Sequence, residues 1–101
     1  MSAIEIEGNQ LKVTVPELDF EDLGTLGVKL GLLLERPEPE LVLDLAQVIY
    51  LPSSILGSIL HFSGQARTRN KKVRVRLRDA LRKNLEQLHV ATGMDFDEIQ
   101  G

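Results

Sequence analysis

The stretch Leu41-Val-Leu-Asp-Leu-Ala-Gln-Val-Ile-Tyr-Leu-Pro-Ser-Ser-Ile-Leu-Gly-Ser-Ile-Leu60 contains the two hydrophobic patterns around which the chain is arranged. Its first five residues, a mostly branched apolar run, predict a strand. After Pro52 and the Ser53-Ser54 pair, apolar residues recur at helical spacing. A strand that leads into a helix through a short loop places unpaired amide N–H groups beside two hydroxyls. We therefore expect function to be located at this junction.

The composition predicts a single globular domain over residues 1–101 with an aliphatic core. Hydrophobic residues make up 43% of the chain and charged residues 27%, while aromatics are 4% and Trp is absent, so Leu, Val and Ile must form the core. The absence of Cys excludes disulfides and thiolate chemistry. The first residues lack the basic and apolar regions of a signal peptide, and no apolar run reaches the roughly 18–20 residues that span a bilayer. We expect a soluble, cytoplasmic protein.

The remaining secondary structure follows from hydrophobic periodicity. Alternating apolar residues on either side of Gly8-Asn9 predict a β-hairpin. Leucines at helical spacing from Leu23 to Leu34 predict a helix with Asp19 as its N-cap. The other expected elements are a helix over about 54–69, a strand over 71–78, a helix capped by Asp79 that ends near Gly93, and a terminal segment 94–101 that is either a strand or a frayed tail.

This order, β-β-α-β-α-β-α, predicts the fold class. A strand–helix–strand unit joins parallel strands by a right-handed crossover, whereas the N-terminal hairpin is antiparallel. Several strands keep one polar face, which disfavours a doubly wound sheet covered on both sides. The sequence therefore predicts an α/β fold with a mixed sheet of four to five strands and helices mainly on one face.

Two helix faces stand out by their small residues. Gly24, Gly27 and Gly31 form a stripe in the first helix, and each costs up to about 1 kcal/mol relative to Ala, so we expect a neighbouring element to approach closely there. In the second helix, the predicted buried side chains are those of Ile55, Ile59, Phe62 and Ala66, together with Leu56 and Leu60. The opposite face is small and uncharged, which favours a surface covered by a partner; its residues are Ser54, Ser58, His61 and Gln65, with Gly57 at the border.

Catalytic and metal-binding patterns are missing from the sequence. His61 and His89 stand alone, without the spacing of metal ligands. Ser53 and Ser54 lack the Gly-x-Ser-x-Gly frame of a hydrolase nucleophile, and no nucleotide-binding glycine motif is present. Asp44, inside a strand, is interpreted as a structural hydrogen-bonding residue. We therefore expect a non-enzymatic protein without a metal or cofactor.

Residues 67–83 carry nine basic and one acidic side chains, and Arg74, Arg76 and Arg78 lie on one face of the predicted strand. One interpretation is a solvated sheet face on which the arginines pair with Glu5, Glu7 or Asp44. The alternative is an anionic ligand, either an acidic protein or a lipid surface. Nucleic acid is disfavoured, because no stacking aromatics are interleaved with the arginines.

The Ser53-Ser54 pair also has two interpretations. One is ordinary N-capping of the helix by a hydroxyl. The other is a phosphorylation switch, because a phosphate on Ser54 would be tolerated by the helix dipole but would expel an apolar partner docked there.

The chain resembles the STAS domain of anti-sigma factor antagonists. The resemblance rests on Leu41-Val-Leu-Asp-Leu45, on Pro52-Ser-Ser-Ile-Leu-Gly-Ser-Ile-Leu60, and on the basic segment and strand that follow. In that family an Asp-Ser-Ser/Thr-Gly-Leu-Gly motif opens the second helix, and an anti-sigma factor with serine kinase activity phosphorylates the second hydroxyl. The element order matches the family from about residue 3 to residue 99.

The resemblance implies a regulator of transcription that switches partners. Ser54 falls at the phosphoacceptor position, and Ser53, Leu56 and Gly57 match its neighbours. Pro52 replaces the family's Asp and Ile55 its Gly, so we expect Ile55 to add bulk where a kinase would approach. The implied docking residues are Ser53, Ser54, Gly57, Ser58, His61 and Gln65. Because STAS domains also serve as subunits of stressosomes and lipid-transport complexes, a constitutive subunit of such a complex remains an alternative.

Overall fold

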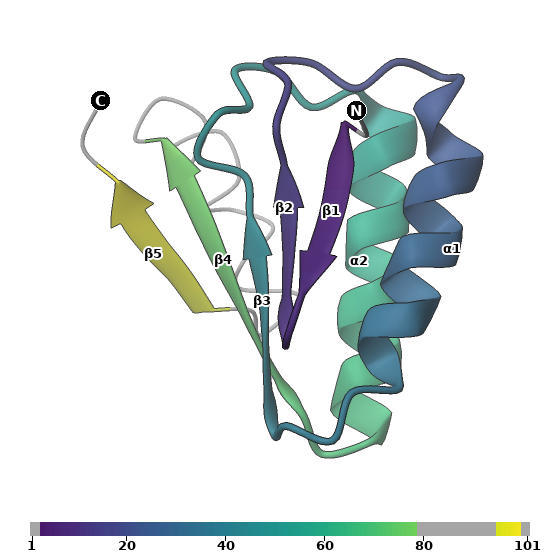
Figure 1. Ribbon diagram of the computed structural model, residues 1–101, viewed down its shortest axis with the longest axis vertical. Coiled ribbons are helices and arrows are strands. Elements are labelled where there is room, and N and C mark those ends of the chain that lie inside the picture. Colours follow the sequence, from purple (N-terminus) through teal and green to yellow (C-terminus); the bar gives the residue numbers. More distant parts are fainter. Residues whose placement is uncertain (1–2, 79–94, 100–101) are drawn as a thin grey trace.

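The computed structural model describes residues 3–78 and 95–99. Side chains are described for residues 3–78. Two helices, α1 (Asp22–Leu34) and α2 (Ser53–Thr68), lie side by side along one face of a five-stranded sheet (Figure 1). The strands are β1 (Ile4–Glu7), β2 (Gln10–Val13), β3 (Glu40–Asp44), β4 (Lys72–Arg78) and β5 (Asp95–Ile99). They are arranged in sequence order, with β1 antiparallel to β2 and each later pair parallel.

This arrangement confirms the predicted α/β fold with a mixed sheet and helices on one face. The hairpin turns at Gly8, whose φ of 59° lies in the left-handed region that glycine adopts without a steric cost. Residues 95–99 form β5, so the terminal segment is a strand. The helix predicted from Asp79 to near Gly93 falls outside the described residues.

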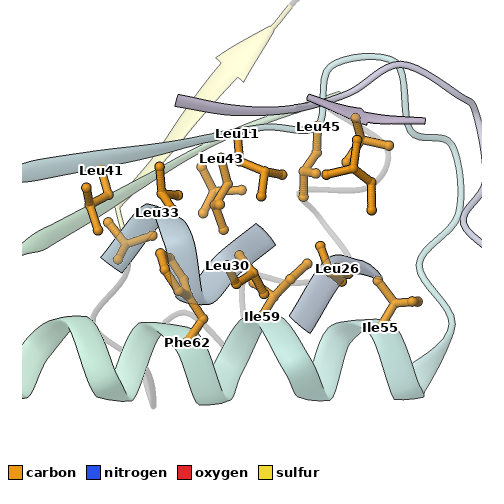
Figure 2. Packing of buried hydrophobic residues seen from close by; sticks show 14 of the residues in the cluster. Leu11, Leu26, Leu30, Leu33, Leu41, Leu43, Leu45, Ile55, Ile59 and Phe62 are labelled. Carbon is orange, nitrogen blue, oxygen red and sulfur yellow. The ribbon is translucent and has the colours of Figure 1, made fainter. Parts of the chain in front are cut away.

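The core lies between the sheet and the two helices, as the hydrophobic periodicity predicts (Figure 2). The leucines of α1 at positions 26, 30, 33 and 34 are buried, because their spacing of three and four residues places them on one side of the helix. From α2 the buried apolar side chains are those of Ile55, Ile59, Phe62 and Ala66. Burial of each large apolar side chain contributes about 1.5–3 kcal/mol, so this layer fixes α2 against the sheet.

The N-terminus of α1 differs from the prediction. Asp19 is not the N-cap: the N-cap is Glu21, which makes no side-chain cap hydrogen bond. The chain first makes a turn, in which the Asp22 N–H donates to the Asp19 carbonyl oxygen at 3.0 Å. The Asp22 carboxylate then accepts a hydrogen bond from the backbone N–H of Asp19 at 2.8 Å. The helix therefore begins two residues later than predicted, and the carboxylate contact at this turn comes from Asp22 in place of Asp19.

The glycines of α1 also differ from the prediction. A Cβ atom added at Gly24, Gly27 or Gly31 would meet nothing within 4 Å, so no neighbouring element approaches the helix there. All three residues are exposed, on the part of α1 that faces away from its buried leucines. Their spacing placed them on a shared stripe, but that stripe borders open space.

Neither described helix has the length and apolar character that a membrane-spanning segment needs.

Candidate partner-docking site

The loop between β3 and α2 is held in place by buried side chains and backbone hydrogen bonds. Leu45 and Val48 are buried, and the Leu45 N–H donates to the Arg76 carbonyl oxygen at 2.9 Å. The Ile49 N–H donates to the Pro16 carbonyl oxygen at 2.8 Å. Tyr50 forms a parallel bridge with Glu17. The loop therefore has a defined path from the sheet to the first turn of α2.

This path presents two large apolar side chains to solvent just before α2 begins. Ile49 is 61% exposed and Tyr50 is 55% exposed, although both follow the buried Val48. Exposed apolar side chains held by an ordered backbone are typical of protein–protein contact sites. Sequence reasoning missed both residues; the available signal was the continuous apolar run from Val48 to Leu51, too long to be buried entirely in a loop.

The first turn of α2 lacks the predicted hydroxyl cap. Pro52 is the N-cap, with φ −59° and ψ 152°, and the helix has no side-chain cap hydrogen bond. The Pro52 carbonyl oxygen accepts a hydrogen bond from the Leu56 N–H at 2.9 Å. Ser53 and Ser54 lie inside the first turn, and both are exposed. The capping interpretation of the two serines is therefore wrong, and neither hydroxyl is needed to begin the helix.

Ile55 points away from this surface. Its relative exposure is 0%, and its side chain lies in the core beneath α2 (Figure 2). The expectation that Ile55 adds bulk where a kinase would approach is therefore wrong, because the helical position after Ser54 turns its side chain toward the sheet. Of the two departures from the STAS motif, only Pro52 lies beside the exposed serines.

The predicted polar face of α2 divides into two parts. Ser58, His61 and Gln65 line a groove of about 400 Å³ between α1 and α2. Its lining includes buried side chains, Leu30, Leu34 and Phe62, and the small residues Gly27 and Gly31 of α1. Ser53, Ser54 and Gly57 are exposed nearer the start of the helix and do not line the groove.

The groove carries an ion pair at one end. Arg69 Nη1 lies 3.4 Å from Glu35 Oε1, and both residues line the groove at the C-terminal ends of α1 and α2. Outside the groove, toward the start of α2, the exposed residues Ser53, Ser54 and Gly57 carry no charge. We call the six predicted residues, taken together with the exposed loop residues Ile49 and Tyr50 that precede the helix, the α2 surface.

The arginines of β4 are paired within the sheet. Arg76 Nη1 lies 3.2 Å from Asp44 Oδ2, and Arg74 Nε lies 3.3 Å from Glu40 Oε1. Arg78 Nε donates to the Ala46 carbonyl oxygen at 2.8 Å. The prediction that the arginines pair with acidic residues across the strands is therefore confirmed for Arg76 and Asp44. The predicted structural role of Asp44 as a hydrogen-bonding residue is confirmed as well.

The two other predicted partners, Glu5 and Glu7, are on β1, which β2 and β3 separate from β4. Glu5 is instead in register with Lys12, and Lys12 with Asp44. Charges therefore alternate in sign across this face of the sheet, which reduces its attraction for an anionic ligand. Within residues 3–78 and 95–99, no group of three or more His, Cys, Asp or Glu residues could hold a metal ion.

Comparison with known proteins agrees with this architecture. The family model described as "Mlab, STAS domain" matches residues 2–96. Among solved structures, the chain is similar to SiaC in the crystal structure of the diguanylate cyclase SiaD in complex with its activator SiaC from Pseudomonas aeruginosa. The TM-score is 0.68 at 17% identity, and the match covers 99% of this chain and 93% of that chain. At this identity the likeness establishes a shared fold.

No curated protein matches the chain. The family model nevertheless spans all the described strands and both described helices, apart from the last three residues of β5. It includes the strand, loop and helix that carry the α2 surface. The chain therefore belongs to the STAS domain family described as Mlab, STAS domain.

Proposed function

We propose that this STAS domain is a non-catalytic regulatory module that binds a partner protein through the α2 surface. The observation that carries the proposal is the combination of exposed Ile49 and Tyr50 with the uncharged first turns of α2. Apolar and aromatic side chains anchor protein interfaces, and a neighbouring uncharged surface is desolvated at little cost. The partner is a cytoplasmic regulatory protein of the anti-sigma factor or serine kinase type.

Two comparisons support a regulatory role. STAS domains of anti-sigma factor antagonists act by binding partner proteins, and this chain belongs to the STAS family. SiaC, which shares the fold, is named as the activator of the diguanylate cyclase SiaD and was crystallised in complex with it. Both are consistent with a STAS fold that serves as a binding surface rather than as a catalyst.

Phosphorylation of Ser54 is the proposed control of this binding. A phosphate there would add about −1.5 to −2 charges at the N-terminus of α2, where the helix dipole favours negative charge. The domain itself would remain folded, because Ser54 is exposed and does not cap the helix. A partner seated on Tyr50 and Ser54 would instead have to desolvate the dianion, so binding would be lost.

The test is partner recovery with immobilised wild type, Ser54→Ala and Ser54→Asp, measured by quantitative mass spectrometry of bound proteins. We expect wild type and Ser54→Ala to retain the same partner and Ser54→Asp to lose it. Thr68→Asp, which places the same charge at the other end of α2, is the control and should retain the partner. Equal recovery with all four proteins would sink the switch, and loss with Thr68→Asp would show that the effect is not specific to Ser54.

A constitutive subunit of a lipid-transport or stressosome complex is the second candidate. Pro52 favours it, because the carboxylate that the motif places beside the phosphoacceptor is missing. This candidate predicts that Ser54 carries no phosphate in protein isolated from cells, and that the domain co-purifies with an ATPase of a membrane complex. Detection of phosphate on Ser54 by mass spectrometry would rule against it.

A further inference from the structure

Strand β1 forms one edge of the sheet, because β2 lies on one side of it and no described strand lies on the other (Figure 1). The Thr14 N–H donates to the Ala3 carbonyl oxygen at 2.9 Å, one residue beyond the first register pair of β1 and β2. Hydrogen-bonded pairs alternate with non-hydrogen-bonded pairs in an antiparallel ladder, so Glu5 and Glu7 bond to β2 and Ile6 does not. The N–H and C=O groups of Ile6 are therefore directed toward the outer edge, where a further strand would bond to them.

A row of charged residues crosses the face of the sheet opposite the helices and ends at this edge. The row of register partners consists of Asp97, Arg76, Asp44, Lys12 and Glu5. Its charges alternate in sign from strand to strand, and the last of them, on exposed Glu5, is negative. A strand added beside β1 would continue the alternation only with a basic side chain next to Glu5.

Glu7 adds a second negative charge at the same edge. It is exposed, and it lies on the same face of β1 as Glu5 because side chains alternate along a strand. Its register partner on β2 is the uncharged Gln10. A basic side chain next to Glu7 is therefore favoured as well, two residues from the first in the added strand.

On the helix side of the sheet, the same edge borders a hollow of about 390 Å³. Its lining residues are Ile6 of β1 and, from α1 and the segment after it, Lys29, Leu32, Glu35, Arg36 and Pro37. Leu32 is 54% exposed and Ile6 is half-buried. Neighbouring residues on adjacent strands share a face of the sheet, so the side chain placed next to Ile6 would face this hollow.

The charges around the hollow differ from those on the opposite face of the edge. Lys29 and Arg36 are basic, and the one carboxylate in the lining, that of Glu35, lies 3.4 Å from Arg69 Nη1. A basic side chain buried there would meet two like charges, whereas an apolar one would contact Ile6 and Leu32. The edge therefore favours an added strand with basic residues on one face and an apolar residue on the other.

We propose that β1 binds an extended segment of a partner protein as an added strand, with basic residues next to Glu5 and Glu7 and an apolar residue between them, next to Ile6. Backbone hydrogen bonds to Ile6 hold the segment, and the alternating side chains select it. None of these residues belongs to the α2 surface, so the segment occupies a second binding site.

A second copy of the chain does not match this edge. Two β1 strands paired about a twofold axis at Ile6 would set Glu5 of each copy against Glu7 of the other, and like charges directly opposite are destabilising. The last strand at the other edge, β5, has the sequence Asp-Phe-Asp-Glu-Ile, so it would also bring acidic residues to β1. The charges therefore favour a basic segment of a different protein.

NMR titration of the full ¹⁵N-labelled chain with a synthetic peptide tests the proposal. The probe is acetyl-Thr-Lys-Val-Lys-Val-Lys-Thr-amide, which carries the basic and apolar alternation. We expect saturable binding, with the largest shift changes at the amides of residues 5–7 and of Leu32. The control peptide, acetyl-Thr-Val-Lys-Lys-Lys-Val-Thr-amide, has the same composition but places a Lys between two others. It should bind at least about tenfold more weakly, because that Lys would enter the hollow beside Lys29 and Arg36.

Charge reversal tests the contribution of the two carboxylates. The double variant Glu5→Lys and Glu7→Lys should bind the alternating basic peptide at least about tenfold more weakly, because two attractive cross-strand pairs become repulsive. It should instead bind acetyl-Thr-Glu-Val-Glu-Val-Glu-Thr-amide, which also shows that the variant is folded. Glu21→Lys makes the same change of charge at an exposed residue before α1, where Glu21 makes no cap hydrogen bond, and should bind as wild type does.

Three results would overturn the proposal. Equal binding of the two basic peptides would mean that Glu5 and Glu7 attract any cation without strand addition. Shifts at residues 5–7 that depend on protein concentration alone would identify a second copy as the occupant. The absence of saturable binding would leave the acidic residues as a guard against edge-to-edge aggregation only.

Discussion

Arg76 Nη1 on β4 lies 3.2 Å from Asp44 Oδ2 at the end of β3, and the two residues are register partners. The second carboxylate oxygen of Asp44 accepts a hydrogen bond from the backbone N–H of Ala46 at 3.1 Å. The side chain of Asp44 is 7% exposed, so these contacts offset the desolvation of a nearly buried carboxylate. They also fix the first residues of the loop that carries Ile49 and Tyr50.

Asp44→Ala should lower the free energy of unfolding by about 1–3 kcal/mol, because it leaves the Ala46 N–H and the Arg76 guanidinium without this carboxylate. Urea denaturation measures the change. Glu40→Ala is the control, since Glu40 and Arg74 are each 41% exposed and such a pair contributes less than about 1 kcal/mol. Equal losses in the two variants would contradict the structural role of Asp44.

Gly27→Ala and Gly31→Ala should each raise the free energy of unfolding by about 0.5–1 kcal/mol. An Ala at either position gains helix propensity, and its Cβ meets nothing within 4 Å. Gly8→Ala is the opposite control and should destabilise the protein, because the φ of Gly8 is 59°. A destabilised Gly27→Ala would mean that a neighbouring group occupies the space beside α1.

Ile55→Ala should cost about 2–5 kcal/mol of stability, because it opens a cavity beneath α2. Ile49→Ala, the same substitution at an exposed position in the preceding loop, should change the stability by no more than about 0.5 kcal/mol. Thermal or urea unfolding of the two variants provides the comparison. A small effect at Ile55 would be inconsistent with its position in the core.

Hydrophobic periodicity predicted most of the fold because burial follows from it directly. The spacing of Leu26, Leu30 and Leu33 identifies the buried side of α1 whatever lies against it, and the fold class followed from the order of such segments. What lies opposite an exposed stripe depends on distant parts of the chain. The prediction therefore placed Gly24 and Gly27 correctly on one side of α1, but the predicted close approach of a neighbouring element there was wrong.

The candidate site was likewise predicted where it follows from local spacing and missed where it depends on distant contacts. The i, i+3 and i+4 spacing of Ser58, His61 and Gln65 predicted a shared face, and the structure places all three on one groove. Tyr50 was missed because its exposure depends on contacts with residues 16 and 17, which are distant in sequence. A local pattern contains no information about such contacts.

Tyr50→Ala should weaken binding of the partner by about 2 kcal/mol or more, roughly 30-fold in Kd, since a Tyr at the centre of an interface is commonly a dominant contact. Its stability should change little, because the side chain is 55% exposed. Isothermal titration calorimetry with the purified partner measures the effect. Val28→Ala, which removes an exposed apolar side chain from α1, should bind the partner as wild type does; an equal loss there would argue against the α2 surface.

Pro52 occupies the N-cap of α2 in the extended conformation that a capping side chain requires, with φ −59° and ψ 152°. An Asp at this position, as in the STAS motif, could accept a hydrogen bond from an N–H of the first turn. Both Pro52→Asp and Pro52→Ala lose the rigidity of proline, so the difference between them isolates the cap. Pro52→Asp should be about 0.5–2 kcal/mol more stable than Pro52→Ala in urea denaturation. Equal stability would show that the first turn of α2 does not accept a side-chain cap from position 52.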